Sequence, residues 1–197
     1  MYFLSPFWHY KGETDMVYFI ADMHLGHDNI IRLCGRPFKY VEDMDATIIN
    51  NWNSRVKDED TVYILGDIAF KSVSDPVQII KKLKGHKILI KGNHDGRNMK
   101  NPAFRACFDR IDNLSTEAIN GERVVVCHYP IMEWDGYFRG AWHVYGHVHN
   151  NTTNKCFQYI LNEPNMLNAG VDITGFKPVT LEELKVLNEK FKAQYLK

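Results

Sequence analysis

The stretch Lys87-Ile88-Leu89-Ile90-Lys91-Gly92-Asn93-His94-Asp95 joins a short apolar run to a group of polar residues. Four other apolar runs end in the same way, at Asp22-Met23-His24, Gly66-Asp67, His128 and Gly146-His147-Val148-His149. Short continuous runs of aliphatic residues are typical of strands that are buried on both faces. Because the carboxyl ends of neighbouring strands in an α/β sheet meet at one crevice, we expect these polar groups to converge.

The segments between the first three apolar runs have the spacing of helices. Ile48, Ile49, Trp52 and Val56 recur on one helical face, and a second stripe of Val77, Ile80 and Leu83 begins just after Pro76. Strands alternating with helices indicate an α/β fold.

The second half of the chain has a different pattern. Residues 156–161 and 166–169 are predicted to form further strands, with no helix of convincing length between them. Residues 180–183, with the sequence Thr-Leu-Glu-Glu, are a capping box that opens a last helix. We therefore expect a mixed sheet, or two packed sheets, closed by a C-terminal helix.

Composition sets the class of protein. A chain of 197 residues is long enough for one substantial core, and we expect an N-terminal extension at residues 1–15 and a single domain at residues 16–197. Its 24 basic and 24 acidic residues balance, which argues against a strong nucleic-acid footprint. The four cysteines are far apart and indicate reduced thiols in a cytoplasmic protein. No apolar run approaches the length of a membrane span, and Pro6 interrupts the apolar N-terminus, which argues against a signal peptide.

The polar groups at the strand ends have the chemistry of metal ligands. They supply carboxylate and carboxamide oxygens together with imidazole nitrogens, a mixture that suits Mn, Fe or Zn. Residues two apart in an extended segment point to the same side, so the D-x-H pair and the H-x-H pair are each able to reach one cluster.

The order D-x-H, G-D, G-N-H-D, H, G-H-x-H resembles the calcineurin-like metallophosphoesterase superfamily, and is most similar to its compact bacterial and phage members. The resemblance covers residues 22–149, about two thirds of the chain. It implies a four-layer αββα sandwich of two mixed β-sheets flanked by helices, two divalent metal ions, and hydrolysis of phosphate esters by a metal-bridged hydroxide.

The resemblance also implies a role for each residue of the motifs. Asp22, His24 and His149 would hold the first metal, and Asn93, His128 and His147 the second, with Asp67 bridging both. His94 would face the phosphate as a catalytic residue, and Asp95 would orient its imidazole.

Two segments should border the site, at residues 27–40 and 129–142. Arg36 and Arg139 are candidates for binding phosphate, with surface or packing positions as the alternative, and His27 is a candidate for lining the cleft. The aromatic residues of these segments could stack on a flat substrate, but we expect most of them to pack the loops onto the sheet. Asp172 is interpreted as a turn or capping residue.

The sequence predicts a metal-dependent phosphoesterase that prefers phosphodiesters to phosphomonoesters, with a nucleotide among the candidate substrates. Two alternatives stay open. One is a scaffold of the same fold without catalysis, against which the complete set of seven ligands and His94 argues. The other is a nuclease or nucleic-acid end-processing enzyme, against which the balanced charge argues. The sequence does not decide the oligomeric state.

Overall fold

The computed structural model describes residues 15–70, 73 and 75–196. The predicted N-terminal extension falls, except for Asp15, outside the described residues.

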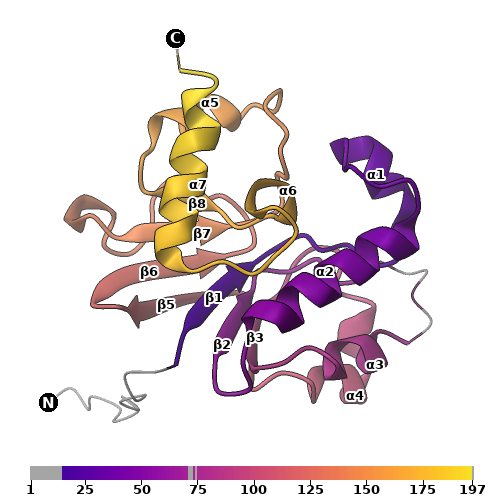
Figure 1. Ribbon diagram of the computed structural model, residues 1–197. Helices are drawn as coiled ribbons and strands as arrows, with labels where there is room; N and C mark the ends of the chain where they lie inside the picture. The colour runs from indigo at the N-terminus through magenta and orange to yellow at the C-terminus, as the bar shows by residue number, and fades with distance from the viewer. Residues whose placement is uncertain (1–14, 71–72, 74, 197) are drawn as a thin grey trace, which may run out of the picture.

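Two four-stranded sheets form the centre of the protein (Figure 1). The first contains β1 (Val17–Ile20), β2 (Thr61–Ile64), β3 (His86–Ile90) and β4 (Arg110–Asp112), all parallel and in that order. The second contains β5 (Leu114–Ile119), β6 (Glu122–Cys127), β7 (Trp142–Tyr145) and β8 (Met166–Asn168), in which only the β5–β6 pair is antiparallel. The predicted fold class is thereby confirmed, although the strands of the first sheet are parallel throughout and only the second sheet is mixed.

Helices flank the sheets (Figure 1). They are α1 (Asp28–Cys34), α2 (Val41–Arg55), α3 (Pro76–Lys81), α4 (Pro102–Arg105), α5 (Phe157–Asn162), α6 (Val171–Thr174) and α7 (Leu181–Ala193), with 3-10 turns η1 (Asn98–Lys100) and η2 (Tyr137–Arg139). The predicted capping box is present at the start of α7, where Thr180 and Glu183 bond to each other's backbone N–H groups. None of the helices in the described part of the chain has the length and apolarity needed to cross a membrane.

Three apolar clusters hold the layers together. The largest packs α2, α3 and α4 against the first sheet and includes Ile48, Trp52 and Phe104. The second lies between the sheets, where Phe19 and Leu65 meet Val126 and Val144, and the side chains Leu181 and Leu184 of α7 close it. The third covers the outer face of the second sheet with α5 and the loop before β7. Each buried strand therefore contributes side chains to two different layers, which is why the strands are continuously apolar.

The prediction of a strand at residues 156–161 was wrong, because the structure has helix α5 there. Phe157, Ile160 and Leu161 are buried, a spacing of three and four residues that fits one helical face. The pattern of a short apolar run does not by itself distinguish a strand from a buried helix, and here tertiary contacts favour the helix.

The two sheets meet where β1 and β8 end. The Ala21 N–H donates to the carbonyl of Ala169, and the Ala169 N–H donates to that of Tyr145, so Ala169 bonds to both sheets. The Val171 N–H then donates back to the carbonyl of Ala21. This seam brings the polar segment after β1 next to the segments that follow β7 and β8.

The core contact of α2 provides a test of the fold. Replacing buried Ile48 by alanine should lower the free energy of unfolding by about 2–5 kcal/mol, because it removes buried methyl groups and leaves a cavity. Ile49→Ala is the matched control, since it makes the same change one residue along the same helix at a partly buried position. Urea denaturation of both variants measures the difference, and an equal loss in the two would contradict this orientation of α2.

Candidate metal centre

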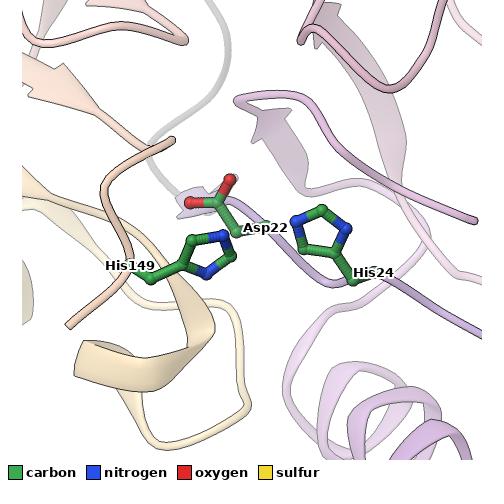
Figure 2. A group of neighbouring side chains, drawn as sticks. All are labelled: Asp22, His24 and His149. Atoms are coloured by element: carbon green, nitrogen blue, oxygen red, sulfur yellow. The ribbon is translucent and has the colours of Figure 1, made fainter. Parts of the chain in front are cut away.

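Three side chains that are far apart in the sequence point toward one another at the seam (Figure 2). Asp22 follows β1, His24 lies two residues further on, and His149 comes from the loop after β7. One ligand atom from each of the three lies within 4.8 Å of the others, as does one from each of Asp22, Asp67 and His128. Both groups could hold a metal ion, and they share Asp22.

The carboxylate of Asp67 belongs to the second group and also reaches His24 of the first. Its Oδ2 atom is 3.6 Å from His24 Nε2 and 3.6 Å from His128 Nε2. Its Oδ1 atom accepts a 2.8 Å hydrogen bond from the backbone N–H of His94, which fixes the orientation of the carboxylate. Asp67 therefore has the position that a carboxylate shared by two cations requires.

Asn93 connects one more histidine, His147, to the second group. Its Oδ1 atom is 2.9 Å from His128 Nε2 and 2.9 Å from His147 Nδ1. His128 Nδ1 lies 2.7 Å from the carbonyl of Leu65 and donates its proton there in the neutral tautomer. Nε2 of His128 then presents a lone pair to the oxygens of Asn93 and Asp67. Acceptor atoms that face one another in this way indicate a cation between them.

Unpartnered buried atoms support this interpretation. Oδ1 of Asp22 and both ring nitrogens of His24 are buried and have no hydrogen-bond partner among the described residues. A buried polar atom without a partner is costly, and such atoms call for a functional explanation. The donor set of carboxylate, carboxamide and imidazole fits divalent first-row metals.

Burial controls the charges of this group. It raises the pKa of the fully buried Asp22 carboxyl from 3.8 to about 6, partly offset by His149. Burial, together with the nearby His149 and Arg36, lowers the pKa of His24 to about 2. The imidazole of His24 is therefore neutral at pH 7, the state in which histidine binds metals.

His149 is held by a carboxylate. Its Nδ1 lies 3.0 Å from Oδ2 of Asp172. Burial by itself would lower the pKa of His149, but the contacts with Asp172 and Cys34 and the nearby Asp22 carboxylate together raise it to about 10. A carboxylate on one ring nitrogen of histidine is common where the other nitrogen binds a metal. The ligand atoms of Cys34, His149 and Asp172 also lie within 4.8 Å of one another. Both carboxylate oxygens of Asp172 already bond to Arg36. We therefore interpret this third group as one that orients the His149 ring, and do not assign it a metal ion.

The backbone at the site is left-handed at five residues that are not glycine. These are Asp22, His24, Asp67, His147 and His149, with φ between 51° and 70°. Such angles are uncommon outside glycine and concentrate at functional sites. The D-x-H and H-x-H pairs therefore reach the cluster through tight loops, and the expectation of extended segments at these pairs was wrong.

Gly92 is needed for a close approach between two loops. A Cβ atom there would overlap Oδ1 of Asp67, and it would lie 2.7 Å from the Asp67 backbone nitrogen. The loops after β2 and β3 can touch only if this position lacks a side chain. Gly66 needs to be glycine for two reasons. Its φ of 82° is unfavourable for residues with a side chain, and a Cβ atom there would lie 2.7 Å from His128 Nδ1.

His94 lies on the open side of the cluster. Its side chain is 45% exposed, and its Nε2 is 4.0 Å from Oδ2 of Asp67. It borders a cleft of about 840 Å³ that is lined by five imidazoles, by α1 and by residues 150–154. The five imidazoles belong to His24, His27, His94, His147 and His149. A substrate in the cleft could therefore contact His94 and the metal ligands together.

Asp95 has a different environment from the one predicted. It is fully buried, and its two oxygens accept hydrogen bonds from the backbone N–H groups of Asp67, Ile68 and Gly92. Burial raises its pKa, although these N–H groups oppose the shift. Asp95 thus ties the loops after β2 and β3 together and holds Asp67 in place, in contrast to the predicted contact with the His94 ring.

The three candidate substrate contacts lie in different places. His27 lines the cleft, and its ring stacks on Phe70 with the centroids 3.7 Å apart. Arg139 is 72% exposed beside Asp135, and it is not among the described residues that line the cleft. The side chain of Arg36 is 0% exposed and bonds to Asp172 and to backbone carbonyls, so it has no surface with which to bind a substrate.

Two residues of the site's support were missed by the sequence analysis. Asp172 was interpreted as a turn residue, and Asn168 was not considered, although its Nδ2 donates a 2.7 Å hydrogen bond to the carbonyl of His149. Both lie at or just after the end of β8. The rule that polar residues at strand ends converge would have found them if it had been applied to this strand as well.

Comparisons with known proteins agree with the fold. No family model matches the chain. The uncharacterized protein MJ1445 of Methanocaldococcus jannaschii is 34% identical over 178 residues, which cover 89% of this chain and 93% of that protein. The solved structure of AQ665 from Aquifex aeolicus, a protein of unknown function, has 30% identity and a TM-score of 0.68, and the match covers 88% of this chain and 99% of that one. A structure described as a novel archaeal phosphodiesterase has 16% identity and a TM-score of 0.50, with 85% and 94% covered, and shows the fold alone.

The chain belongs to the same family as MJ1445, because the identity extends over nearly the whole of both proteins.

The pKa of Asp22 yields a test of the site's electrostatics. In the metal-free protein, the contribution of this group to stability is present below pH 3.8 and is lost as the pH rises through about 6, because the folded state must then carry a buried charge. Asp22→Asn avoids this charge. Between pH 4 and pH 8 the free energy of unfolding of the variant should therefore rise by roughly 1–3 kcal/mol relative to that of the wild type.

Urea denaturation with a chelator present measures this change, with Asp109→Asn as the control at an exposed carboxylate. Saturating metal should reverse the order, since metal binds to and stabilises the folded wild type. A difference in stability between variant and wild type that stays constant from pH 4 to pH 8 without metal would contradict this account.

Proposed function

We propose that this protein is a phosphoesterase that depends on two divalent metal ions, Mn, Fe or Zn, and that phosphodiesters are its preferred substrates. The observation that carries the proposal is the position of Asp67 Oδ2, within 4.0 Å of three imidazole nitrogens that belong to His24, His128 and His94. Two of these histidines face the buried ligand groups and the third faces the cleft. The carboxylate of Asp67 would therefore lie next to both the metal ions and the part of the cleft that a substrate can reach.

The ligands divide into two sets. Asp22, His24 and His149 would hold one ion, Asn93, His128 and His147 would hold the other, and Asp67 would contact both. Bound divalent ions of this kind lower the pKa of water and offset the charge that develops on a phosphate. A structure described as an archaeal phosphodiesterase has the same fold, so the fold is compatible with such chemistry. The support for the activity in this protein comes from the residues of the site.

His94 would act on the leaving group. Its imidazole is half exposed at the edge of the cleft, and its backbone is held by the hydrogen bond to Asp67. From this position Nε2 could donate a proton to the leaving alcohol oxygen, or stabilise the charge on it. Asp95 would contribute indirectly, by holding the loop that carries Asp67.

The form of the cleft favours a diester. It extends from the imidazoles along Ile30 and Leu33 of α1 to the polar residues 150–154 on the other side. A volume of about 840 Å³ leaves room for a second ester substituent beside the phosphate. His27 would contact that substituent from the wall, where it stacks on Phe70.

Metal removal and replacement test the proposal. After chelation, Mn²⁺, Fe²⁺, Zn²⁺ or Mg²⁺ is restored singly, and hydrolysis of bis(4-nitrophenyl) phosphate is compared with that of 4-nitrophenyl phosphate. We expect turnover only with metal, and faster hydrolysis of the diester. Asp67→Asn should weaken the binding of both ions and abolish turnover, whereas Asp109→Asn should leave both unchanged. A protein that binds no stoichiometric metal would contradict the proposal and favour the scaffold.

His94→Ala separates catalysis from metal binding. The variant should keep both metal ions and lose about 10²–10⁴ in kcat, because general acid catalysis typically contributes this factor. His86→Ala is the control, since His86 is an exposed histidine that pairs with Asp109 away from the cleft. Metal analysis beside steady-state kinetics measures both quantities, and an empty metal site in His94→Ala would show that His94 is a ligand.

A further inference from the structure

We infer that the buried pair Arg36–Asp172 is a positioning device for one half of the metal centre, the group formed by Asp22, His24 and His149. This inference rests on the proposed function only in taking these residues as metal ligands. Neither Arg36 nor Asp172 would contact the substrate. Their effect would pass through the backbone before His24 and through the ring of His149.

The guanidinium of Arg36 reaches both sides of this group. Its Nη2 donates a 2.8 Å hydrogen bond to the carbonyl of Asp22, and Nη1 donates a 3.0 Å bond to that of Met23. On its other side, Nε and Nη2 bond to the two carboxylate oxygens of Asp172 at 2.8 and 3.1 Å. One planar cation therefore holds the D-x-H loop and, through a bidentate contact, the carboxylate that bonds to His149.

The second step of the chain is the contact between Asp172 and His149. Oδ2 of Asp172 accepts from Nδ1 of His149 at 3.0 Å, which leaves Nε2 of His149 for a metal. The rings of His149 and His24 are 5.1 Å apart, and both lie beside Asp22 (Figure 2). If Asp172 were displaced, the His149 ring would lose the contact that orients it toward the metal position it shares with Asp22 and His24.

The backbone explains why such a device is needed. Asp22 and His24 have φ angles of 56° and 51°, which are unfavourable for residues with side chains. Strained angles persist only where surrounding contacts over-determine them. The carbonyls that Arg36 holds belong to Asp22 and to Met23, the two residues that precede His24, so the arginine restrains the loop at the place of the strain.

Because the pair is buried, its net contribution to the stability of the fold is expected to be small. The side chains of Arg36 and Asp172 are 0% and 2% exposed. Buried ion pairs contribute little net stability, because desolvation offsets their attraction, and apolar residues of similar size often replace them without loss. The pair makes contacts that apolar residues could not make, namely the two carbonyls and the His149 ring.

The contacts are confined to one half of the centre. The side-chain hydrogen bonds described for Arg36 and Asp172 are with each other, with the carbonyls of Asp22 and Met23, with Met44 and with His149, and none of them is with His128, Asn93 or His147. The described link to the other half is the carboxylate of Asp22, whose Oδ2 accepts from the backbone N–H of His147. Loss of the pair should therefore weaken one metal ion and spare the other. A residue that merely supported the fold would affect both ions or neither.

The experiment measures Co²⁺ binding to metal-free wild type, Arg36→Met, Asp172→Asn and the double variant, by equilibrium dialysis with metal analysis and by visible absorption. His24→Ala and His128→Ala supply reference spectra for proteins that lack a ligand of one group or the other. We expect the wild type to bind two ions. The three pair variants should bind one of them normally and the other about 10–100-fold more weakly, a typical effect of losing a residue that orients a ligand.

The spectra of the pair variants at one equivalent should match that of His24→Ala. The double variant should be no worse than the more affected single variant, because both residues act through one path. Arg55→Met is the matched control. Nη2 of Arg55 donates to both carboxylate oxygens of Glu183, a contact that joins α2 to α7 away from the candidate metal ligands, so this variant should bind both ions normally.

Each other result has a distinct meaning. A wild type that binds no Co²⁺ contradicts the proposed function itself. Two ions bound normally in the pair variants, or both weakened equally, would overturn the inference while leaving the proposed function intact. Loss of the cooperative unfolding transition in all three pair variants would assign the pair to the fold and would also overturn it.

Discussion

The seam between the two sheets imposes the constraint on which the rest of this structure depends. Buried polar atoms from both sheets face one another there, around Oδ2 of Asp67. Several of them have no hydrogen-bond partner among the described residues. Taking carboxylates and lone pairs out of water costs free energy unless something compensates. Divalent cations are the partners that match this arrangement. Burying these unpartnered atoms is costly, and the apolar layers on each side of the sheets offset that cost.

The apolar layers explain how the protein tolerates unpartnered buried atoms and left-handed backbone angles at the site. The cluster between the sheets packs Phe19 and Leu65 against Val126 and Val144, directly below the loops that carry the ligands. Asp95 and the pair Arg36–Asp172 then bind the loops themselves, using buried charges that accept from or donate to the backbone. The loops can adopt left-handed angles because these groups leave them few alternatives. Precise placement of the ligands is thus a product of rigid strands below and buried ionic contacts around the site.

Only one side of the cluster is open, and this asymmetry connects the structure to a function. His128 and Asp22 are fully buried, whereas His94 is half exposed and borders the cleft. The residues that could hold metal ions lie on the buried side, and the open side leaves room for the proposed substrate beside His94. The same geometry separates the residues proposed to bind metal from His94, the residue proposed to act on the leaving group.

The sequence by itself determined the strands that end at the five polar groups, the capped C-terminal helix and the convergence of those groups, because strand periodicity and strand-end placement are local properties of the chain. The pattern left one mixed sheet or two packed sheets open, and two sheets were implied only by the family resemblance. Tertiary structure decided three other matters. Residues 156–161 became a helix because their apolar side chains were buried on one helical face, a choice that local pattern left open. Asp95 turned to the backbone of the neighbouring loop, and Arg36 turned inward to Asp172, 136 residues away. Which partner a charged side chain finds depends on what the fold brings beside it, and no spacing within the sequence specifies that.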